Sequence, residues 1–397
     1  DKTCRIWDLR TDRVHKALKG FDSTVSSISF TPADDHTVFV ASSNKVYSFD
    51  LRMESLLLDT ALAIRVYEGA EDEINQIQVN HRARYLIACD DAGDVRILDL
   101  KTHEWMRHTR RVHDNIAMTA QFVANKDLQA FSGGMDKLIV AWDFYKGRAI
   151  QIFDTDPQPD PSATHTKQLF NPPFVHSIAA HPSGTRIAVG LGDGSIQFLH
   201  TPTDLPTSME TEPDPNSQAV GSSNSSSIGT SKKTKNKSKK GTSSSSGSNG
   251  EKKMNWLMGG RLSHAHSSPI ASIEYAGFNP NWLVTSSNTG SIAIWDDQAS
   301  RFKTVQQLEQ QRNILPNKES AATAAASHRA LQPLQEFSTR DVFERVNCIL
   351  TYKSQRDVDV DGGDGDITIP QKMLFVAGTH PRVGDKKLQG RIAVYHL

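Results

Sequence analysis

The sequence predicts an all-β protein built from repeated small sheets, and this prediction depends on two observations. Short runs in which apolar side chains alternate with others end in a Trp-Asp pair, or in a degraded copy of it, seven times along 397 residues. The runs end at Asp8, Asp50, Asp99, Asp143, His200, Asp296 and His396. The first three intervals, from Trp7 to Phe49, Leu98 and Trp142, are 42, 49 and 44 residues. One four-stranded sheet cannot bury both of its faces, so sheets repeated at this period stack around an axis and predict a β-propeller.

Residues 113–143 give the clearest repeat. Alternating runs predict strands at 116–122, 128–132 and 138–143, with the tight turn GGMDK before the last one. Asp136 lies six residues before Trp142, and His113 lies upstream of the first strand. The sequence therefore predicts an inner strand, a second strand and a third strand that ends in the Trp-Asp pair.

The remaining runs are rich in Val, Ile and Phe and predict seven third strands in all, hence seven blades. By this count blade 1 keeps only its third and outer strands, and blade 7 lacks its outer strand. Each missing buried apolar side chain would cost ~1.5 to 3 kcal/mol. We therefore expect residues 1–397 to form a single propeller that is truncated at its N-terminus. This expectation would be contradicted if a protein made from these residues alone were soluble and unfolded cooperatively.

Two insertions interrupt the later repeats. Residues 203–252, in blade 5, are rich in Ser, Gly and Lys and nearly free of apolar side chains, which predicts disorder. Their lysines between Lys232 and Lys240 suit either a solvated linker, a nuclear-import signal or a weak nucleic-acid contact. Residues 301–330, in blade 6, are rich in Gln and Ala and have no clear apolar face.

Composition favours an intracellular scaffold. Lys plus Arg equals Asp plus Glu at 45 each, so no global field draws the chain to nucleic acid or to an anionic membrane. No apolar run approaches the ~18 to 20 residues of a membrane helix. Cys4, Cys89 and Cys348 lie singly in predicted strands without disulfide or zinc spacing, and we expect them to be small core residues. A reducing compartment follows, cytoplasmic or nuclear.

The residues with catalytic or metal-binding chemistry do not form a set. The segment from Asp357 to Asp366 imitates a calcium loop, but Thr368 occupies the position that requires a bidentate Glu, and strands rather than helices are predicted on both sides. The sequence shows no nucleophile, base and orienting residue that together form a recognisable catalytic set. We therefore predict no enzyme activity, no metal and no cofactor.

An Asp-x-Arg motif directly after a third strand is the most informative exposed chemistry. It occurs at Asp8 and Arg10 and again at Asp50 and Arg52, with a weaker copy ending in Lys101. A residue just past that strand emerges on one rim of a propeller, where an Arg fork can pair bidentately with a partner carboxylate. The alternative is an Arg that caps the turn of its own blade or meets solvent.

The Trp-Asp repeats and the Asp-x-Arg motif resemble the WD-repeat (WD40) family. In that family a His, a turn Asp, a strand Ser or Thr and the Trp form a hydrogen-bonded tie within a blade, which His113, Asp136, Ser132 and Trp142 resemble. The segments HDNI (113–116), QLFNPPFVHSIA (168–179), ERVNCIL (344–350) and GRIAVYHL (390–397) are similar to one group of its members.

The resemblance implies a substrate receptor of a cullin-4 RING ubiquitin ligase. The implied adaptor contacts are Asp8, Arg10, Asp50 and Arg52, and an unknown substrate protein would bind elsewhere on the propeller. One alternative is a scaffold in chromatin or ribosome assembly that never meets a ligase, with the lysine tract as its discriminating feature. Another is a propeller enzyme or peptide reader, which requires acids or aromatic side chains at the axial mouth.

Overall fold

The structure is a computed structural model that describes residues 2–8, 13–32, 34, 36–106, 111–156, 171–204 and 255–297. It also describes the strand backbones of 335–338, 345–358, 367–381 and 388–396. The chain divides into two units, Asp1–Leu205 with Asn255–Leu397, and Pro206–Met254. The second unit lies outside the described residues, as do both the lysine tract and the insertion predicted over 301–330.

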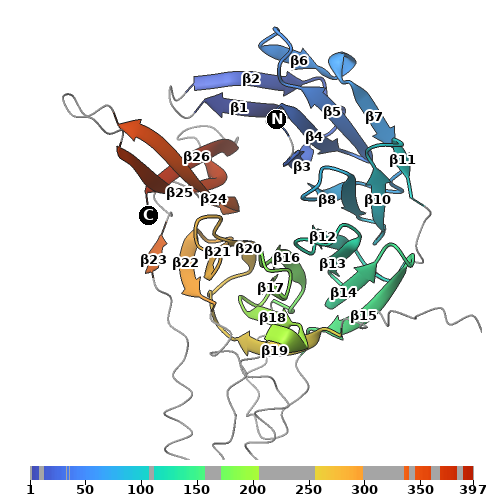
Figure 1. Cartoon of the computed structure of the whole chain (residues 1–397), viewed down its shortest axis with the longest axis vertical. Helices are drawn as coiled ribbons and strands as arrows, with labels where there is room; N and C mark the ends of the chain where they lie inside the picture. The colour runs from blue at the N-terminus through green and yellow to red at the C-terminus, as the bar shows by residue number, and fades with distance from the viewer. Residues whose placement is uncertain are drawn as a thin grey trace, which may run out of the picture. The chain divides into compact units, whose positions relative to one another are not determined.

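The described strands of the first unit form seven sheets (Figure 1). The first three sheets join β1-β2-β6, β3-β4-β5-β7 and β8-β9-β10-β11. Their bounds are β1 (Cys4–Asp8), β2 (Arg13–Lys19), β3 (Val25–Phe30), β4 (Thr37–Ser42), β5 (Lys45–Asp50), β6 (Leu57–Asp59), the 3-10 turn η1 (Thr60–Leu62), β7 (Arg65–Glu68), β8 (Ile74–Val79), β9 (Tyr85–Asp90), β10 (Val95–Asp99) and β11 (Glu104–Trp105).

The other four sheets follow in chain order. Three of them have four strands, and the last joins β24-β25-β26. Their bounds are β12 (Ala117–Phe122), β13 (Gln129–Gly134), β14 (Leu138–Asp143), β15 (Arg148–Asp154), β16 (Val175–Ala180), β17 (Arg186–Leu191), β18 (Ile196–His200), the 3-10 turn η2 (Pro202–Asp204), β19 (Leu257–Leu262), β20 (Ile270–Tyr275), β21 (Trp282–Ser287), β22 (Ser291–Asp296), β23 (Gln335–Ser338), β24 (Arg345–Val358), β25 (Ile367–Pro381) and β26 (Leu388–His396).

The all-β prediction is confirmed, because repeated antiparallel sheets make up nearly all of the described secondary structure. The strands β12, β13 and β14 begin within one residue of the predicted 116, 128 and 138. The count of seven blades stays a prediction, because two of the seven sheets have three strands. The described part of the chain holds no helix long and apolar enough to cross a membrane.

The inner strands of successive sheets lie side by side and are joined by a regular set of hydrogen bonds. Inner strands contact one another in the order β3, β8, β12, β16, β20 and β24. The Oγ atoms of Ser27 and Ser29 on β3 accept from the backbone N–H groups of Ile77 and Val79 on β8. In the next pair, Gln76 and Gln78 of β8 accept from two N–H groups of β12, those of Ala120 and Phe122. Side-chain acceptors therefore satisfy backbone donors that face away from their own sheet.

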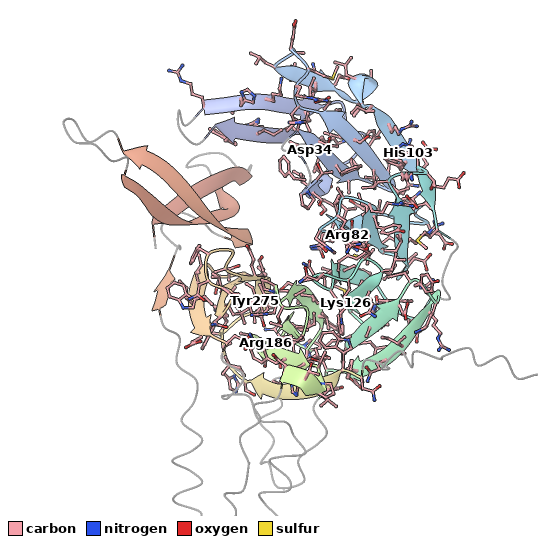
Figure 2. The ribbon with its side chains drawn as sticks, viewed as in Figure 1. Asp34, Arg82, His103, Lys126, Arg186 and Tyr275 are labelled. Atoms are coloured by element: carbon pink, nitrogen blue, oxygen red, sulfur yellow. The ribbon has the colours of Figure 1, made fainter. Side chains whose placement is uncertain are left out.

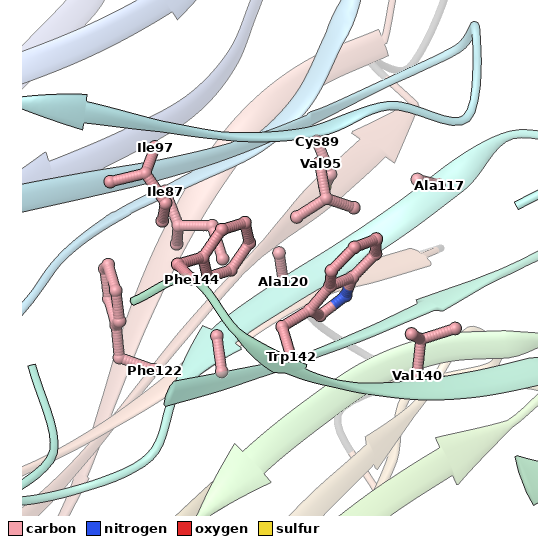
Figure 3. Packing of buried hydrophobic residues seen from close by; sticks show 11 residues of the cluster. Ile87, Cys89, Val95, Ile97, Ala117, Ala120, Phe122, Val140, Trp142 and Phe144 are labelled. Atoms are coloured by element: carbon pink, nitrogen blue, oxygen red, sulfur yellow. The ribbon is translucent and has the colours of Figure 1, made fainter. Parts of the chain in front are cut away.

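Apolar side chains fill the space between neighbouring sheets. Between the sheets of β8–β11 and β12–β15, Ile87 and Ile97 face Phe122, Trp142 and Phe144, and all are at most 5% exposed (Figure 3). The rings of Trp142 and Phe144 stack with centroids 5.4 Å apart. Removing a side chain of this size from such a core costs ~3 to 5 kcal/mol. This core explains why the alternating pattern predicted the sheets.

Two of the three cysteines lie in these cores as predicted. Cys4 is 5% exposed, and burial raises the pKa of its thiol to about 11. Cys89 is fully buried, and burial raises the pKa of its thiol as well. A thiol whose pKa is raised by burial is mostly un-ionised near neutral pH, so both behave as small apolar residues. The side chain of Cys348 lies outside the described residues.

Two local features differ from the sequence prediction. The segment after β5 leaves its own sheet, and β6 pairs in parallel with β2, with Leu57 beside Ala17. The sequence missed this strand because three residues are too few to show a periodicity. In addition, Thr203 and Asp204 belong to η2, an ordered turn that composition alone does not show. The insertion over 203–252 stays a prediction, because residues 205–252 lie outside the described residues.

Candidate functional site

The Asp-x-Arg motif lies where the third strand of a sheet ends, at a turn that recurs from sheet to sheet. We call this the rim turn: it starts at the last residue of the third strand. In each rim turn the next residue donates its backbone N–H to the carbonyl of the residue just before the second strand. These bonds run from Leu51 to His36 (2.8 Å), Leu100 to Arg84 (2.9 Å), Phe144 to Leu128 (2.8 Å), Thr201 to Thr185 (2.9 Å) and Asp297 to Asn281 (2.7 Å). Five rim turns are therefore structurally equivalent.

In the rim turn after β5, Arg52 pairs with the aspartate of its own motif. Its Nε lies 3.0 Å and 3.1 Å from the two carboxylate oxygens of Asp50, and its Nη2 donates to Oδ2 at 2.6 Å. The backbone N–H of Arg52 also donates to Asp50 Oδ1 at 2.9 Å. The side-chain bond from Arg52, followed by the backbone bond, lowers the pKa of Asp50 to about 2. The pair therefore stays charged through the physiological range.

The same guanidinium keeps donors for a second acceptor. The side chain of Arg52 is 68% exposed and that of Asp50 is 23% exposed. A guanidinium has five N–H donors, and Asp50 occupies only its Nε and Nη2 groups, which leaves the Nη1 edge without an acceptor among the described residues. The turn therefore holds an exposed arginine in one orientation with donors to spare.

The weaker third copy is arranged differently. Asp99 accepts from Arg84, the residue just before β9, with Nε and Nη2 at 2.9 Å and 2.7 Å from its two oxygens. This bond from Arg84 is the main cause that lowers the pKa of Asp99. Lys101, at the motif position, gives Asp99 only its backbone N–H, at 2.8 Å. Arg84 was missed in the sequence because it is fifteen residues away along the chain.

The rim turn after β14 carries Tyr145 at the motif position. Asp143 accepts the backbone N–H of Lys146 at 3.1 Å and lies 3.2 Å from its Nζ. Tyr145 is 84% exposed, the largest value among the exposed large apolar side chains of the described residues. The sequence analysis also missed this residue. The available signal was the order Asp143-Phe144-Tyr145, which, like Asp50-Leu51-Arg52, has an Asp and then an apolar residue before its last position.

The first copy of the motif can be placed only in part. Asp8 is the last residue of β1 and pairs with Arg13 in the strand register. The side chain of Asp8 and all of Arg10 lie outside the described residues. The structure therefore describes the geometry of one complete Asp-x-Arg motif, that of Asp50 and Arg52.

The four residues of the expected tie lie in one hydrogen-bonded chain inside the sheet of β12–β15. Trp142 Nε1 donates to Ser132 Oγ at 2.7 Å, and Ser132 Oγ lies 2.7 Å from His113 Nε2. His113 Nδ1 lies 2.9 Å from Asp136 Oδ2. Because an ionised carboxylate only accepts, His113 Nδ1 carries the proton that faces Asp136, and Ser132, which accepts from the indole, can donate its own proton to Nε2. His113 is fully buried, so the chain is a structural element of the sheet.

A second tie, which the sequence analysis missed, lies in the sheet of β20–β23. Trp295 Nε1 donates to Thr285 Oγ1 at 2.9 Å, and Thr285 Oγ1 lies 2.7 Å from His266 Nε2. His266 Nδ1 faces the hydroxyl of Ser291 at 2.7 Å instead of a carboxylate. The spacings of nineteen and ten residues match those of the first tie and were the available signal.

A partly buried ionic cluster joins η2, which follows the rim turn after β18, to the rim turn after β22. Arg186 Nε lies 3.1 Å from Asp204 Oδ2, and its Nη1 lies 3.5 Å from Asp297 Oδ2. Tyr275 donates to Asp297 at 2.5 Å, and desolvation raises the pKa of that carboxyl. Figure 2 shows Arg186 and Tyr275 in neighbouring sheets. The cluster therefore links η2 to the residue that follows β22.

Comparison with known proteins identifies the repeat. The family model WD domain, G-beta repeat, matches residues 260–296, which include His266, Thr285 and Trp295 of the second tie. The WD repeat-containing protein 53 homolog of Dictyostelium discoideum is 30% identical over 209 residues, which is 49% of this chain and 56% of that protein. The match therefore spans about half the length of this relative.

The fold and these matches agree with one another. WD40 repeats form sheets of the observed kind, and proteins of this class generally act as non-enzymatic scaffolds for protein interactions. Residues 260–296 match a WD40 repeat, the repeated four-stranded sheets are those of a WD40 β-propeller, and the chain is similar to the WD repeat-containing protein 53 homolog of Dictyostelium discoideum.

Proposed function

We propose that this interaction scaffold is an intracellular substrate receptor of a cullin-4 RING ubiquitin ligase. The rim turn of Asp50 and Arg52 is the docking element, and Asp8 and Arg10 supply the second copy. One observation carries the proposal: Asp50 holds an exposed arginine in a fixed orientation while its Nη1 edge has no acceptor among the described residues.

The pre-oriented fork explains why this turn suits docking. Fixing a long side chain at an interface costs ~0.5 to 1.5 kcal/mol, and here the intramolecular pair with Asp50 fixes it before binding. A partner carboxylate that reaches the Nη1 edge meets an arginine already in place. Arg suits this role better than Lys because its planar fork can serve two acceptors at once.

The function itself would follow from proximity. A receptor docked on the ligase raises the effective concentration of a substrate lysine near the charged ubiquitin carrier. The protein contributes no catalytic group to this mechanism. A substrate protein would bind away from the docking turn, on loops of the propeller.

The test is a binding measurement with the full chain and the purified cullin-4 adaptor. We expect the wild type to bind, and Arg52→Ala to raise the Kd about tenfold or more, as truncation of a central interface arginine typically does. Arg52→Lys should lose most of the same affinity because an ammonium cannot replace the fork.

Arg82→Ala is the matched control. Arg82 is 66% exposed, and its Nη1 pairs with Asp127 Oδ2 at 2.9 Å, so it resembles Arg52 in exposure and pairing. It lies between β8 and β9, outside any Asp-x-Arg motif. Absence of adaptor binding by the wild type would contradict the proposed role as a ligase receptor. Equal effects of the Arg52 and Arg82 substitutions would remove the docking role of the motif.

A further inference from the structure

The rim turns after β5, β10 and β14 place three different side chains at one structural position. In each, the preceding residue makes the bond that closes the turn: Leu51 to His36, Leu100 to Arg84, and Phe144 to Leu128. The residues that follow are Arg52, Lys101 and Tyr145. The three sheets are consecutive, and their inner strands β3, β8 and β12 contact one another in that order. The three positions therefore follow one another along the same rim.

The charge of each turn aspartate is neutralised within its own sheet. Asp50 pairs with Arg52, Asp99 with Arg84, and Asp143 with Lys146. Because Arg84 occupies Asp99, the exposed ammonium of Lys101 has no carboxylate partner among the described residues. The same arrangement at Asp143 leaves the exposed Tyr145 outside the ion pair. These three turns therefore present cationic groups and one aromatic ring, while their three aspartates are already paired.

Tyr145 has the features of a binding anchor. The residue is 84% exposed, yet the backbone beside it is fixed by bonds from Lys146 N to Asp143 O (3.1 Å) and from Gly147 N to Phe144 O (3.2 Å). A tyrosine loses only two side-chain rotations on binding and buries a large area, and Tyr and Arg are enriched at the centres of protein interfaces. An exposed ring on a rigid turn, in line with Arg52, is therefore suited to insert into a partner.

We propose that Arg52, Lys101 and Tyr145 form one docking ridge across three successive blades. The inference rests on the proposed function and extends it: the adaptor surface that meets this ridge carries carboxylates opposite Arg52 and Lys101 and an apolar recess for Tyr145. Charge complementarity selects this occupant, since the ridge offers a free ammonium and guanidinium donors and no unpaired aspartate among its three turn acids.

Binding kinetics of the full chain on immobilised adaptor test the ridge. Tyr145→Ala should raise the Kd about tenfold, mainly through faster dissociation, because it removes a buried anchor. Tyr145→Phe should keep most of the affinity, since the ring supplies the buried area. Lys101→Glu should slow association several-fold and weaken its dependence on salt, because an exposed charge acts mainly through long-range attraction.

Two control variants make the same kinds of chemical change at residues outside the rim turns. Ile152 is 53% exposed on β15 of the same sheet as Tyr145, and Ile152→Ala removes exposed apolar area outside the rim turn. Lys19 is exposed at the end of β2. This end pairs with the start of β1, so Lys19 lies opposite the rim, and Lys19→Glu makes the same charge change there. Both controls should bind as the wild type does.

The outcomes separate the ridge from the proposed function. Loss of affinity with Arg52→Ala but wild-type binding by the Tyr145 and Lys101 variants overturns the ridge and leaves ligase docking in place. Loss with Tyr145→Ala and Lys101→Glu but not with Arg52→Ala overturns the docking role of the arginine and, because Arg52 is one of its three residues, the three-residue ridge as well. Absence of adaptor binding by the wild type overturns both.

Discussion

The sheets of β12–β15 and β20–β23 hold their strands together with the same chain of hydrogen bonds, except at one end. Both chains run from a Trp indole through a hydroxyl to the Nε2 atom of a buried His. At Nδ1 the first has the carboxylate of Asp136, and the second has the hydroxyl of Ser291. A buried carboxylate and a hydroxyl thus serve the same architectural position.

The difference shows which part of the tie depends on charge. Ser291 is not the end of its chain, because its hydroxyl lies 2.7 Å from that of Ser287, which in turn lies 3.2 Å from Thr289. A series of neutral hydroxyls can redirect its hydrogen bonds when one partner is lost. The carboxylate of Asp136 cannot do so, and its side chain is only 8% exposed. The first tie should therefore tolerate loss of its His less well than the second.

The largest expected effect comes from removing each His in turn. His113→Ala should lower the free energy of unfolding by about 3 kcal/mol, because it leaves a largely buried carboxylate without its imidazole donor. His266→Ala should cost about 2 kcal/mol, because only neutral groups lose a partner. Urea denaturation of the two variants beside the wild type measures both values. Equal losses would show that the charge of Asp136 has no part in the difference.

A pH titration of stability tests how much the second tie depends on a neutral His266. Burial lowers the pKa of His266 from 6.5 to about 4 in the folded protein. The unfolded chain then takes up the proton first, so the stability associated with neutral His266 is present above about pH 6.5 and is lost as the pH falls toward 4. Between pH 7 and pH 5 this loss amounts to about 2 kcal/mol.

Comparison with His266→Asn isolates that contribution. Asn does not titrate, so the stability advantage of the wild type over this variant should shrink by about 2 kcal/mol between pH 7 and pH 5. His181 serves as the internal reference, because desolvation lowers its pKa to about 4 as well and both proteins retain it. A constant difference between the two proteins across this interval would mean that His266 takes up its proton equally well in the folded state.

The sequence predicted the first tie and not the second, for a physical reason. The first has the full set of His113, Ser132, Asp136 and Trp142, so its resemblance to the family pattern was direct. In the second, Thr289 stands six residues before Trp295, where the first tie has its aspartate, and Ser291 takes over the contact with His266. A hydroxyl shows no distinctive signal in a sequence, because serines are common in turns.

The rim turns illustrate the same limit for the candidate site. The motif Asp50-Leu51-Arg52 could be found because its partners are two residues apart. The pairing of Asp99 with Arg84 needs the register of β9 and β10, and the exposure of Tyr145 needs the packing around β14. The presence and order of the strands were predictable from the alternation of apolar residues. Which side chain pairs with a given carboxylate depends instead on which one the fold brings close to it.

A smaller effect is expected from replacing the carboxylate itself. Asp136→Asn retains an oxygen that can accept from His113 Nδ1 and removes the charge, which brings the first tie close to the chemistry of the second. The expected loss is about 1 kcal/mol, that of one charge-assisted hydrogen bond weakened to a neutral one. Asp136→Ala is the control that removes the acceptor altogether. If Asn and Ala cost the same, the amide does not replace the acceptor, and the two ties are less alike than their geometry indicates.

The smallest effect on stability is expected at the rim turn, where a substitution should cost much less than one in either tie. Arg52→Ala should leave the urea midpoint unchanged within error, because exposed ion pairs add little to stability and the bond from Leu51 N to His36 O still closes the turn. The measurement is the same denaturation series, with Arg82→Ala as the matched exposed pair. A clear loss of stability with Arg52→Ala alone would mean that the guanidinium caps its own turn, and reduced adaptor binding by that variant would then report on folding. An unchanged midpoint together with weakened binding assigns Arg52 to the interface, because a side chain that does not stabilise the fold can affect binding only through the partner it contacts.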